Sequence, residues 1–364
     1  MNPVRTIVPL LATSLLTTLI LAAPSHGAVL TMGAGQTYAT LGAAVAAAVA
    51  GDTIDVLAGT YVDQVATINI PLTIEGVGGT PVFTQTGGTQ LANLKGFLVV
   101  NANLTVDNIR FQGASISAGN GGNGAGIRYQ GGNLTISNSQ FVNNQDGILG
   151  FPDNTGPNTG TILIQNSAFT GNGSGTGQTH AVYVGQVAAL TVIGSTFSGT
   201  LVGHDIKSRA ANTTVTGNTL DDGVSGTTSY AIDIAEGGNA TITGNTLTQG
   251  PNTQNSTLIS YAAEGVTWAD NSLRVMGNVF TNTNATAIGV NNQAGSVTAL
   301  VSCNAFSGVP VLTQGLAILT GNVTGTAVPA CGQAVPEPSG LLLLLSGLPL
   351  LLGARSRRLG RRAV

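Results

Sequence analysis

Apolar and polar residues alternate along short segments that recur through most of this chain. The segments read LTVDNIRF, LTISNSQF, ILIQNSAF, LTVIGSTF, TTVTGNTL, ATITGNTL, LRVMGNVF and ALVSCNAF, and they end at Phe111, Phe141, Phe169, Phe197, Leu220, Leu247, Phe280 and Phe306. Alternation with a period of two is typical of a β-strand that has one buried face. Because the segments recur every 23 to 33 residues and are broken by Asn and Gly, they predict a stacked β-solenoid with one coil per repeat.

One apolar position of each segment should stack on the same position of the next coil, inside the solenoid. The predicted inner positions are Val106, Ile136, Ile164, Val192, Val215, Ile242, Val275 and Val301. In many repeats an asparagine lies two or three residues after this inner position, at Asn138, Asn166, Asn218, Asn245 and Asn278. Asn tolerates a left-handed backbone and hydrogen-bonds its neighbours, so we interpret these residues as structural turn residues.

A second strand-like segment recurs in each repeat. It reads GIRYQ (126–130), GILGF (147–151), AVYVG (181–185), DIKSR (205–209), AIDIA (231–235), LISYA (258–262) and AIGVN (287–291). The predicted inward residues are Ile127, Ile148, Val182, Ile206, Ile232, Ile259 and Ile288, which leaves Arg128, Leu149, Tyr183, Lys207, Asp233, Ser260 and Gly289 facing outward. Coils of a parallel solenoid lie roughly 4.8 Å apart, so outward neighbours should be within contact range.

The segment before these repeats predicts an end cap. It contains an Ala-rich helix from about Thr40 to Ala50, followed by strands at 53–57 and from Tyr61. A short amphipathic helix shields the first coil from water and from strand pairing, and the lack of basic residues disfavours a membrane-surface helix. Together the cap and the repeats resemble the right-handed parallel β-helix of the pectin-lyase-like superfamily over most of residues 28–335. We therefore expect an all-β, right-handed parallel β-helix with a short N-terminal capping helix.

Residues 1–27 have the layout of a secretory signal peptide. Arg5 precedes an apolar run, which ends in small residues around Ser25 and Gly27. We expect cleavage before Ala28 and export of the mature chain. A transmembrane anchor is the alternative, and the short apolar run disfavours it.

Residues 336–364 have the three ordered parts of a sorting tail. Val335 to Pro338 read VPEP, an apolar segment runs from Leu341 to Leu352, and the arginines that follow are Arg355, Arg357, Arg358, Arg361 and Arg362. This order resembles the PEP-CTERM signal of Gram-negative bacteria. The resemblance implies recognition by an exosortase at the inner membrane, a final place in the cell envelope or extracellular matrix, and an association with extracellular polysaccharide. A permanent membrane anchor is the alternative.

Charge changes the picture once both ends are removed. Residues 28–335 keep fourteen acidic and six basic residues, a balance of about −8. A nucleic-acid partner is disfavoured because no basic footprint remains.

Cys303 and Cys331 are the only two cysteines. An even pair in an exported chain predicts a disulfide. A metal site would need more soft ligands nearby, so we expect none at these cysteines.

Ionisable residues are rare in this chain, at 7% charged, yet several gather between residues 179 and 210. In the outward column Tyr183, Lys207 and Asp233 should occupy consecutive coils, with Asp205 and Arg209 on the same face as Lys207. His180, His204 and Tyr230 precede their strands at equivalent positions, and Glu236 and Glu264 follow shortly after. The repeat therefore predicts one exterior patch built from residues distant in sequence.

Such a patch suits β-elimination on an acidic sugar, in which a cation neutralises the carboxylate, a base removes the adjacent proton and an acid protonates the leaving oxygen. Lys207 or neutral His204 is the candidate base, and Tyr183 or Arg209 the group that assists the leaving oxygen. The expected substrate-binding residues are His180, Asp205, Tyr230, Asp233, Glu236 and Glu264. HDIKSRA resembles the catalytic Lys and Arg region of alginate lyases and chondroitinase B-like lyases, although there the two residues generally come from different coils.

Two carboxylates, Asp233 and Glu236, are candidate calcium ligands by the same resemblance, and no other cofactor is expected. We expect a monomer that acts on a polysaccharide partner.

Several other interpretations remain open. Asp205, Asp233 and Glu236 offer carboxylate pairs for glycoside hydrolysis, which nearby cations disfavour. The charged residues could instead form a surface ion-pair ladder in a non-catalytic matrix or adhesin-like protein. An outward threonine ladder at Thr105, Thr135, Thr191, Thr214 and Thr241 could bind a crystalline surface, although Leu163, Arg274 and Leu300 interrupt it, and we interpret it mainly as β-propensity.

Overall fold

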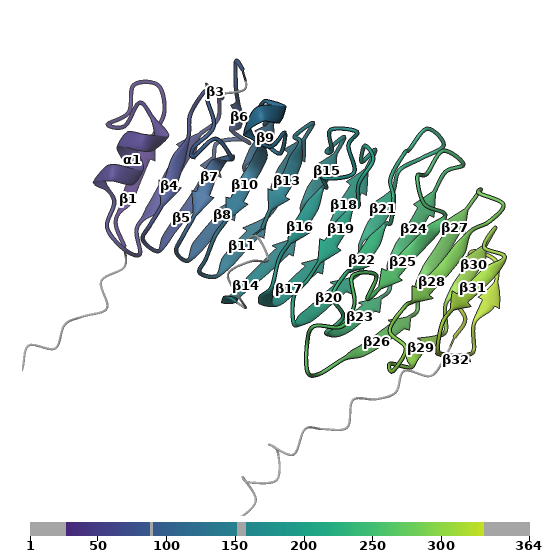
Figure 1. Ribbon diagram of the computed structural model, residues 1–364. Helices are drawn as coiled ribbons and strands as arrows, with labels where there is room; N and C mark the ends of the chain where they lie inside the picture. Colours follow the sequence, from purple (N-terminus) through teal and green to yellow (C-terminus); the bar gives the residue numbers. More distant parts are fainter. Residues whose placement is uncertain (1–26, 88–89, 151–157, 331–364) are drawn as a thin grey trace, which may run out of the picture. The chain divides into compact units, whose positions relative to one another are not determined.

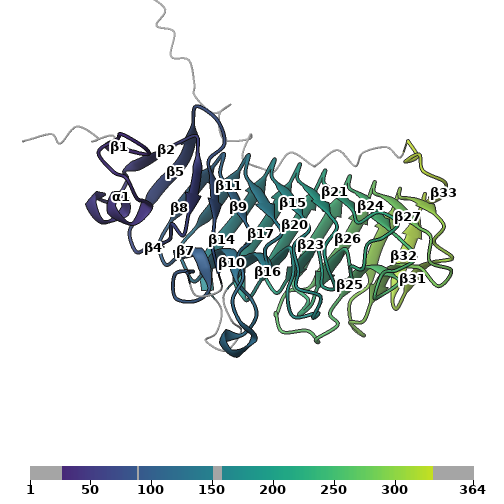
Figure 2. The ribbon, with the colours of Figure 1, turned by 90° about the horizontal axis from the view of Figure 1, so that it is seen from above.

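The structure is a computed structural model, which describes residues 27–87, 90–150 and 158–330. Three parallel β-sheets form this part of the protein. Each coil contributes one strand to a twelve-stranded, then to an eleven-stranded and then to a ten-stranded sheet (Figure 1). Successive coils lie side by side when the ribbon is seen from above (Figure 2). The predicted parallel β-helix is confirmed.

The strands have the following bounds. The twelve-stranded sheet contains β1 Val29–Met32, β2 Thr53–Leu57, β5 Leu72–Val77, β8 Leu104–Asp107, β11 Leu134–Ser137, β14 Asn158–Gln165, β17 Val187–Ile193, β20 Asn212–Thr216, β23 Asn239–Thr243, β26 Ser272–Met276, β29 Ala299–Ser302 and β32 Ala317–Thr320. The eleven-stranded sheet contains β3 Thr60–Val62, β6 Val82–Thr84, β9 Arg110–Gln112, β12 Gln140–Val142, β15 Ala168–Thr170, β18 Thr196–Ser198, β21 Thr219–Asp221, β24 Thr246–Gln249, β27 Val279–Asn282, β30 Ala305–Ser307 and β33 Val323–Thr324. The ten-stranded sheet contains β4 Ala66–Ile68, β7 Gly96–Val100, β10 Ala125–Tyr129, β13 Asp146–Leu149, β16 Val182–Val184, β19 Ile206–Ser208, β22 Ile232–Ile234, β25 Thr257–Tyr261, β28 Ile288–Asn292 and β31 Val311–Gln314.

The core is a set of stacked side chains that run from coil to coil. All eight predicted inner positions of the twelve-stranded sheet, from Val106 to Val301, are fully buried. Phenylalanines of the eleven-stranded sheet stack face to face, with ring centres 4.7 Å apart both for Phe141 and Phe169 and for Phe169 and Phe197. This spacing equals one coil of a parallel solenoid, so the strand spacing sets the stacking distance.

The turn between the twelve- and eleven-stranded sheets uses two adjacent positions differently. The first has a left-handed backbone and holds Asn108, Asn138, Asn166, Gly194, Gly217, Gly244, Gly277 and Cys303. The second is buried and holds Ser139, Ser167, Ser195, Asn218, Asn245, Asn278 and Asn304. In that buried ladder the Asn245 Oδ1 accepts the Asn218 backbone N–H at 2.9 Å, and the Asn278 Oδ1 accepts that of Asn245 at 2.9 Å. The predicted turn asparagines therefore fall into two classes, and only Asn138 and Asn166 need the left-handed backbone.

Helix α1 (Leu41–Ala47) begins at Thr40, whose side chain accepts the Ala43 backbone N–H at 3.2 Å. It buries Leu41 and Ala44 and packs against β1 and β4. A 3-10 turn, η1 (Ala118–Asn120), precedes β10. The function of α1 as an end cap stays a prediction.

Both predicted processing signals fall on residues 1–26 and 331–364, outside the described residues, and so does Cys331. The Cys303 to Cys331 disulfide, export and tail processing therefore stay predictions. In residues 27–330, apart from the gaps, no helix is long and apolar enough to cross a bilayer.

Candidate functional site

The outward column of the ten-stranded sheet brings the predicted patch together. Strand pairing places Tyr183 opposite Lys207, Lys207 opposite Asp233, and Asp233 opposite Ser260, in the consecutive strands β16, β19, β22 and β25. Arg128 and Leu149 precede them in the same register. We call this row the lysine column: Arg128, Leu149, Tyr183, Lys207, Asp233, Ser260 and Asn291.

The last member of the column corrects the sequence prediction. Ser260 pairs with Asn291 and Ile259 with Val290, so the register of β28 is two residues later than expected. Gly289 was predicted to face outward, but a Cβ built on it would lie 2.7 Å from the Phe306 ring. Gly289 therefore lies where the phenylalanine stack leaves no room for a side chain.

Lys207 and Arg209 converge on one carboxylate, that of Glu264. The Lys207 Nζ lies 2.6 Å from Glu264 Oε1, while the Arg209 Nε donates to Oε2 at 2.7 Å and its Nη2 lies 2.5 Å from the same oxygen. Burial alone would raise the pKa of Glu264, but the hydrogen bonds and charges of Lys207 and Arg209 outweigh burial and hold this pKa below its usual value. The two cations thus form a carboxylate-binding pair on the outer face.

Tyr183 joins this pair from the preceding coil. The Arg209 Nη1 donates a hydrogen bond to Tyr183 Oη, and the Arg209 Cζ lies 5.1 Å from the centre of the Tyr183 ring. A guanidinium in this position contacts both the oxygen and the face of the phenol ring. A hydroxyl group that can move a proton therefore lies beside the carboxylate-binding cations.

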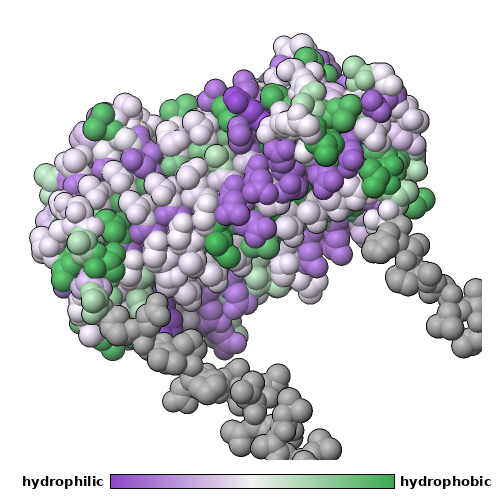
Figure 3. All heavy atoms as spheres, turned by 180° about the vertical axis from the view of Figure 1, so that it is seen from behind, coloured by the Kyte–Doolittle hydropathy of each residue, from purple (hydrophilic) through white to green (hydrophobic). Residues whose placement is uncertain are grey.

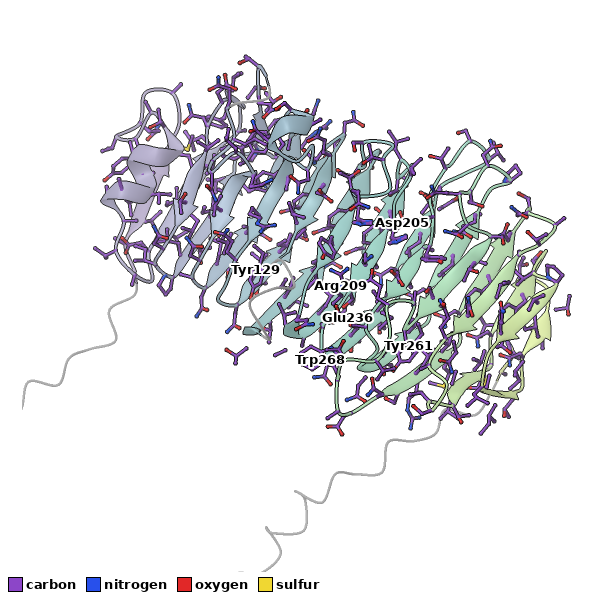
Figure 4. The ribbon with its side chains drawn as sticks, in the orientation of Figure 1. Tyr129, Asp205, Arg209, Glu236, Tyr261 and Trp268 are labelled. Atoms are coloured by element: carbon purple, nitrogen blue, oxygen red, sulfur yellow. The ribbon has the colours of Figure 1, made fainter. Side chains whose placement is uncertain are left out.

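Two more carboxylates lie beneath the cations. Asp233 is 2% exposed, its Oδ2 lies 3.8 Å from Lys207 Nζ, and burial raises its pKa to about 6 against the opposing charge of Lys207. The Glu236 Oε1 lies 3.3 Å from Arg209 Nε, and its Oε2 accepts from Gln186 Nε2 at 2.6 Å. Figure 4 shows Arg209 and Glu236 on neighbouring coils. These carboxylates hold the two cations from the protein side.

These contacts also decide how well Asp233 and Glu236 fit a calcium ion. Both carboxylates are engaged by cationic or amide groups in this arrangement, and their role as calcium ligands stays a prediction. Within the described ranges, no three His, Cys, Asp or Glu side chains are grouped to hold a metal ion.

His180 and His204 stack on each other, and hydrogen bonds from backbone N–H groups to their Nδ1 atoms define which ring nitrogen carries the hydrogen. Their ring centres lie 4.8 Å apart, and the Tyr230 ring stacks on His204 at 4.9 Å. The His180 Nδ1 accepts the His204 backbone N–H at 3.0 Å, and the His204 Nδ1 accepts that of Tyr230 at 3.1 Å. Burial lowers the pKa of His204 to about 3, with a further contribution from Lys207, so the ring is neutral and carries its hydrogen on Nε2.

This geometry removes His204 from the candidate bases. Its one acceptor nitrogen is occupied by a backbone N–H, and its protonated Nε2 lies 3.6 Å from Asp233 Oδ2, beyond hydrogen-bond distance. His180, His204 and Tyr230 thus support the register of the coils under the lysine column. The sequence placed all three in the patch itself, with His204 as a candidate base and His180 and Tyr230 as substrate-binding residues, whereas in the structure His180 and His204 are buried beside it.

Asp205 was predicted to share the face of Lys207, and that prediction is wrong. β19 begins only at Ile206, so the alternation does not extend back to Asp205. Its carboxyl group is fully buried and accepts from Thr200 Oγ1 at 2.6 Å. Burial, with the nearby Asp222 carboxyl group, raises the pKa of Asp205 well above its usual value. In Figure 4 Asp205 lies apart from Arg209 and Glu236.

Sequence reasoning missed three residues that support the site. Asp146 occupies the ladder position before His180, whose backbone N–H it accepts at 2.8 Å, and this equivalence was readable from the repeat. The Trp268 Nε1 donates to the Arg209 carbonyl oxygen at 3.1 Å, and Gln186 holds Glu236. No periodic signal marks Trp268, because it lies in the long segment between β25 and β26.

The sequence matches no protein-family model and no curated protein sequence. Among solved structures, alginate lyase from Paenibacillus sp. str. FPU-7 is similar, with 19% identity, a TM-score of 0.55, and coverage of 78% of this chain and 96% of that one. The PL6 family alginate lyase AlyGC matches at 16% identity and a TM-score of 0.49, over 82% of this chain and 39% of its own. Pectin methylesterase from Aspergillus niger matches at 16% identity and a TM-score of 0.42, over 75% of this chain and 87% of its own. The first likeness places this protein among the parallel β-helices.

Proposed function

We propose that this protein is exported and binds an acidic polysaccharide on the outer face of the ten-stranded sheet. One observation carries the proposal: Lys207 and Arg209 come together on the outer side of the ten-stranded sheet, partly covered, and hold a carboxylate between them. A uronate carboxylate has the same charge and geometry as the carboxylate of Glu264. A similar fold is found in an alginate lyase, an enzyme for an acidic polysaccharide, which supports the substrate class.

The same groups support cleavage by β-elimination. A base removes the proton on the carbon beside the uronate carboxylate, and the electron pair forms a carbon–carbon double bond. The bond between the next carbon and the glycosidic oxygen breaks, and that oxygen takes up a proton. Lys207 and Arg209 would stabilise the negative charge that develops on the carboxylate during proton removal.

We assign the proton transfer to Tyr183. The hydrogen bond from Arg209 stabilises negative charge on its oxygen, which then accepts the sugar proton and passes it to the leaving oxygen. Lys207, with the carboxylates of Glu264 and Asp233 close to its nitrogen, acts in this scheme as the positive charge rather than as the base.

Export and sorting are part of the proposal and depend on the two ends of the chain. The signal-like residues 1–27 would direct secretion, and residues 336–364 would be recognised by an exosortase-type enzyme at the inner membrane. A polysaccharide ligand then agrees with a final place in the envelope or extracellular matrix, where the protein would act as a monomer.

The test is an activity screen of the purified protein on alginate, pectate and glycosaminoglycans, with unsaturated product followed by ultraviolet absorbance. We expect turnover on one of these substrates and loss of both turnover and binding in Lys207→Ala. Thr214→Ala, on the twelve-stranded sheet, is the matched control and should keep both. Absence of binding to every acidic glycan would contradict the proposal.

A non-catalytic matrix or adhesin-like protein is the second candidate. The continuous contacts from His180 through His204 to Asp233 and Lys207 favour it, because they stabilise the register of the coils without any ligand. Glycan binding without turnover on the whole panel would support this candidate.

A further inference from the structure

We further propose that Glu264 is a specificity-determining residue that occupies the carboxylate position of this site and must be displaced by the ligand. The inference deepens the proposed function and depends on it. It predicts selectivity for chains with several carboxylates over single uronic acids.

The contacts of Glu264 are those of a bound carboxylate. Each of its two oxygens binds a different cation, Oε1 binding Lys207 and Oε2 binding Arg209. The Glu264 side chain is 35% exposed, while those of Lys207 and Arg209 are 13% and 12% exposed. Glu264 is therefore the most solvent-exposed group of the three, and a ligand that arrives from water meets it first.

Glu264 has short contacts to both cations, but it is less enclosed by the protein than the other two carboxylates of the cluster. Asp233 is buried on β22, and Glu236 is fixed by both Arg209 and Gln186. Glu264 instead lies in the segment between β25 and β26, where residues 263–267 are all exposed. Water can solvate the partly exposed Glu264 carboxylate once it leaves, and an incoming carboxylate takes over its contacts to the less exposed cations. Rotation of this one side chain opens the cation pair without any change in the strands.

The charge of the cluster explains why exchange is required. Lys207 and Arg209 balance Asp233 and Glu236, and Glu264 makes the cluster negative. An incoming anion is then repelled unless it replaces Glu264. A tethered carboxylate has a high effective concentration, so a single uronate competes poorly, whereas a chain that adds contacts on neighbouring coils competes well.

The test is calorimetric titration of the purified protein with galacturonic acid and with oligogalacturonate and oligoalginate. If Glu264 occupies the site about nine-tenths of the time, its removal should tighten binding about tenfold. We therefore expect Glu264→Gln to bind the oligosaccharides about tenfold more tightly and to bind the single uronate measurably. Glu75→Gln, the same change on the twelve-stranded sheet, is the control and should leave binding unchanged.

Two further variants keep the outcome decisive. Glu264→Asp is too short to reach both cations, so it should give an intermediate affinity, and thermal unfolding checks that each variant is folded. Equal or weaker binding by Glu264→Gln, with wild-type binding that still depends on Lys207, would overturn only this inference. Absence of binding by the wild type and by Glu264→Gln would overturn the proposed function as well.

Discussion

Two outward columns of this solenoid, one on the twelve-stranded sheet and one on the ten-stranded sheet, have the same backbone arrangement and different chemistry. One row on the twelve-stranded sheet, which we call the threonine column, contains Thr53, Thr73, Thr105, Thr135, Leu163, Thr191, Thr214 and Thr241. Arg274 and Leu300 continue this row. On the ten-stranded sheet the lysine column changes residue at every coil. Strand spacing and backbone pairing are shared, so they cannot explain the difference. A repeat tends towards uniform strand-forming residues, and the face that departs from uniformity is where ligand chemistry is expected.

The surface along the threonine column is not flat. A hollow of about 250 Å³ runs along Thr73, Thr105 and Thr135, beside Asn103 and Asn133. Its lining contains no charged residue, whereas the lysine column combines cations, carboxylates and a phenol. Seen from behind, hydrophilic side chains gather over the central coils and apolar ones towards both ends (Figure 3). The two columns therefore differ in the chemistry of the side chains that gather on them, and not simply in whether the surface is hollowed.

The largest expected difference between the columns is catalytic. Tyr183→Phe removes the proposed proton-transfer group and should lower kcat on the substrate about 10²- to 10⁴-fold while leaving binding nearly unchanged. Thr191→Val, an equally small change on the threonine column, should leave kcat unaltered. Steady-state kinetics with both variants checks this, and an active Tyr183→Phe would assign the proton transfer elsewhere.

The cores beneath the two columns should respond alike. Ile206 beside Lys207 and Ile242 beside Thr241 are both fully buried. Replacement of either by Ala should reduce the free energy of unfolding by about 2–5 kcal/mol, because a cavity remains. Denaturant unfolding followed by circular dichroism measures both losses. A much smaller loss for Ile206→Ala than for Ile242→Ala would mean that the core is less tightly packed beneath the lysine column than beneath the threonine column.

Acid should destabilise the lysine column through His204. Its pKa is about 3 in the fold and near 6.5 when unfolded, so the unfolded chain binds more protons between these values. Stability from the neutral ring is complete above about pH 6.5 and is lost as pH falls towards 3, by at most about 1.4 kcal/mol per pH unit. Asp233 opposes this trend because its pKa is raised to about 6. His204→Asn keeps an acceptor for the Tyr230 N–H and removes the titrating ring. The free energy of unfolding of the wild type, measured by denaturant unfolding at several pH values, should therefore fall relative to that of the variant as pH falls. The same pH dependence in both proteins would contradict this role of His204.

The smallest effect is expected on the threonine column itself. Thr214→Ala replaces a partly exposed side chain and should change the free energy of unfolding by less than about 0.5 kcal/mol, without effect on glycan binding. Thermal unfolding and calorimetric titration provide the two readouts. Loss of glycan binding in this variant would move the site to the threonine column.

The parts of this structure that could be predicted are those that the repeat defines. Val106, Ile136 and their successors lie inside, and Tyr183, Lys207 and Asp233 fall on consecutive coils, because a period of two and a fixed coil spacing determine both. Asp205 could not be placed, because alternation holds only within a strand and β19 begins one residue after it. The register of β28 failed for a related reason, since the segment between β25 and β28 differs in length from its counterparts and alternation cannot show a shift of two residues.

Within the site, sequence position was a poor guide to role. His204 lay in the expected place, but only the hydrogen bond from Tyr230 shows that its acceptor nitrogen is occupied. Trp268 and Gln186 support Arg209 and Glu236 from outside the outward column, so no periodic argument reaches them.

The most direct measurement of the central claim is a crystal structure of the protein with a bound oligouronate. The account predicts a sugar carboxylate within 4 Å of Lys207 Nζ and of the Arg209 guanidinium, with the Glu264 side chain turned away from both. A glycan bound in the hollow along Thr73, Thr105 and Thr135, with the contacts of Glu264 to Lys207 and Arg209 intact, would contradict it.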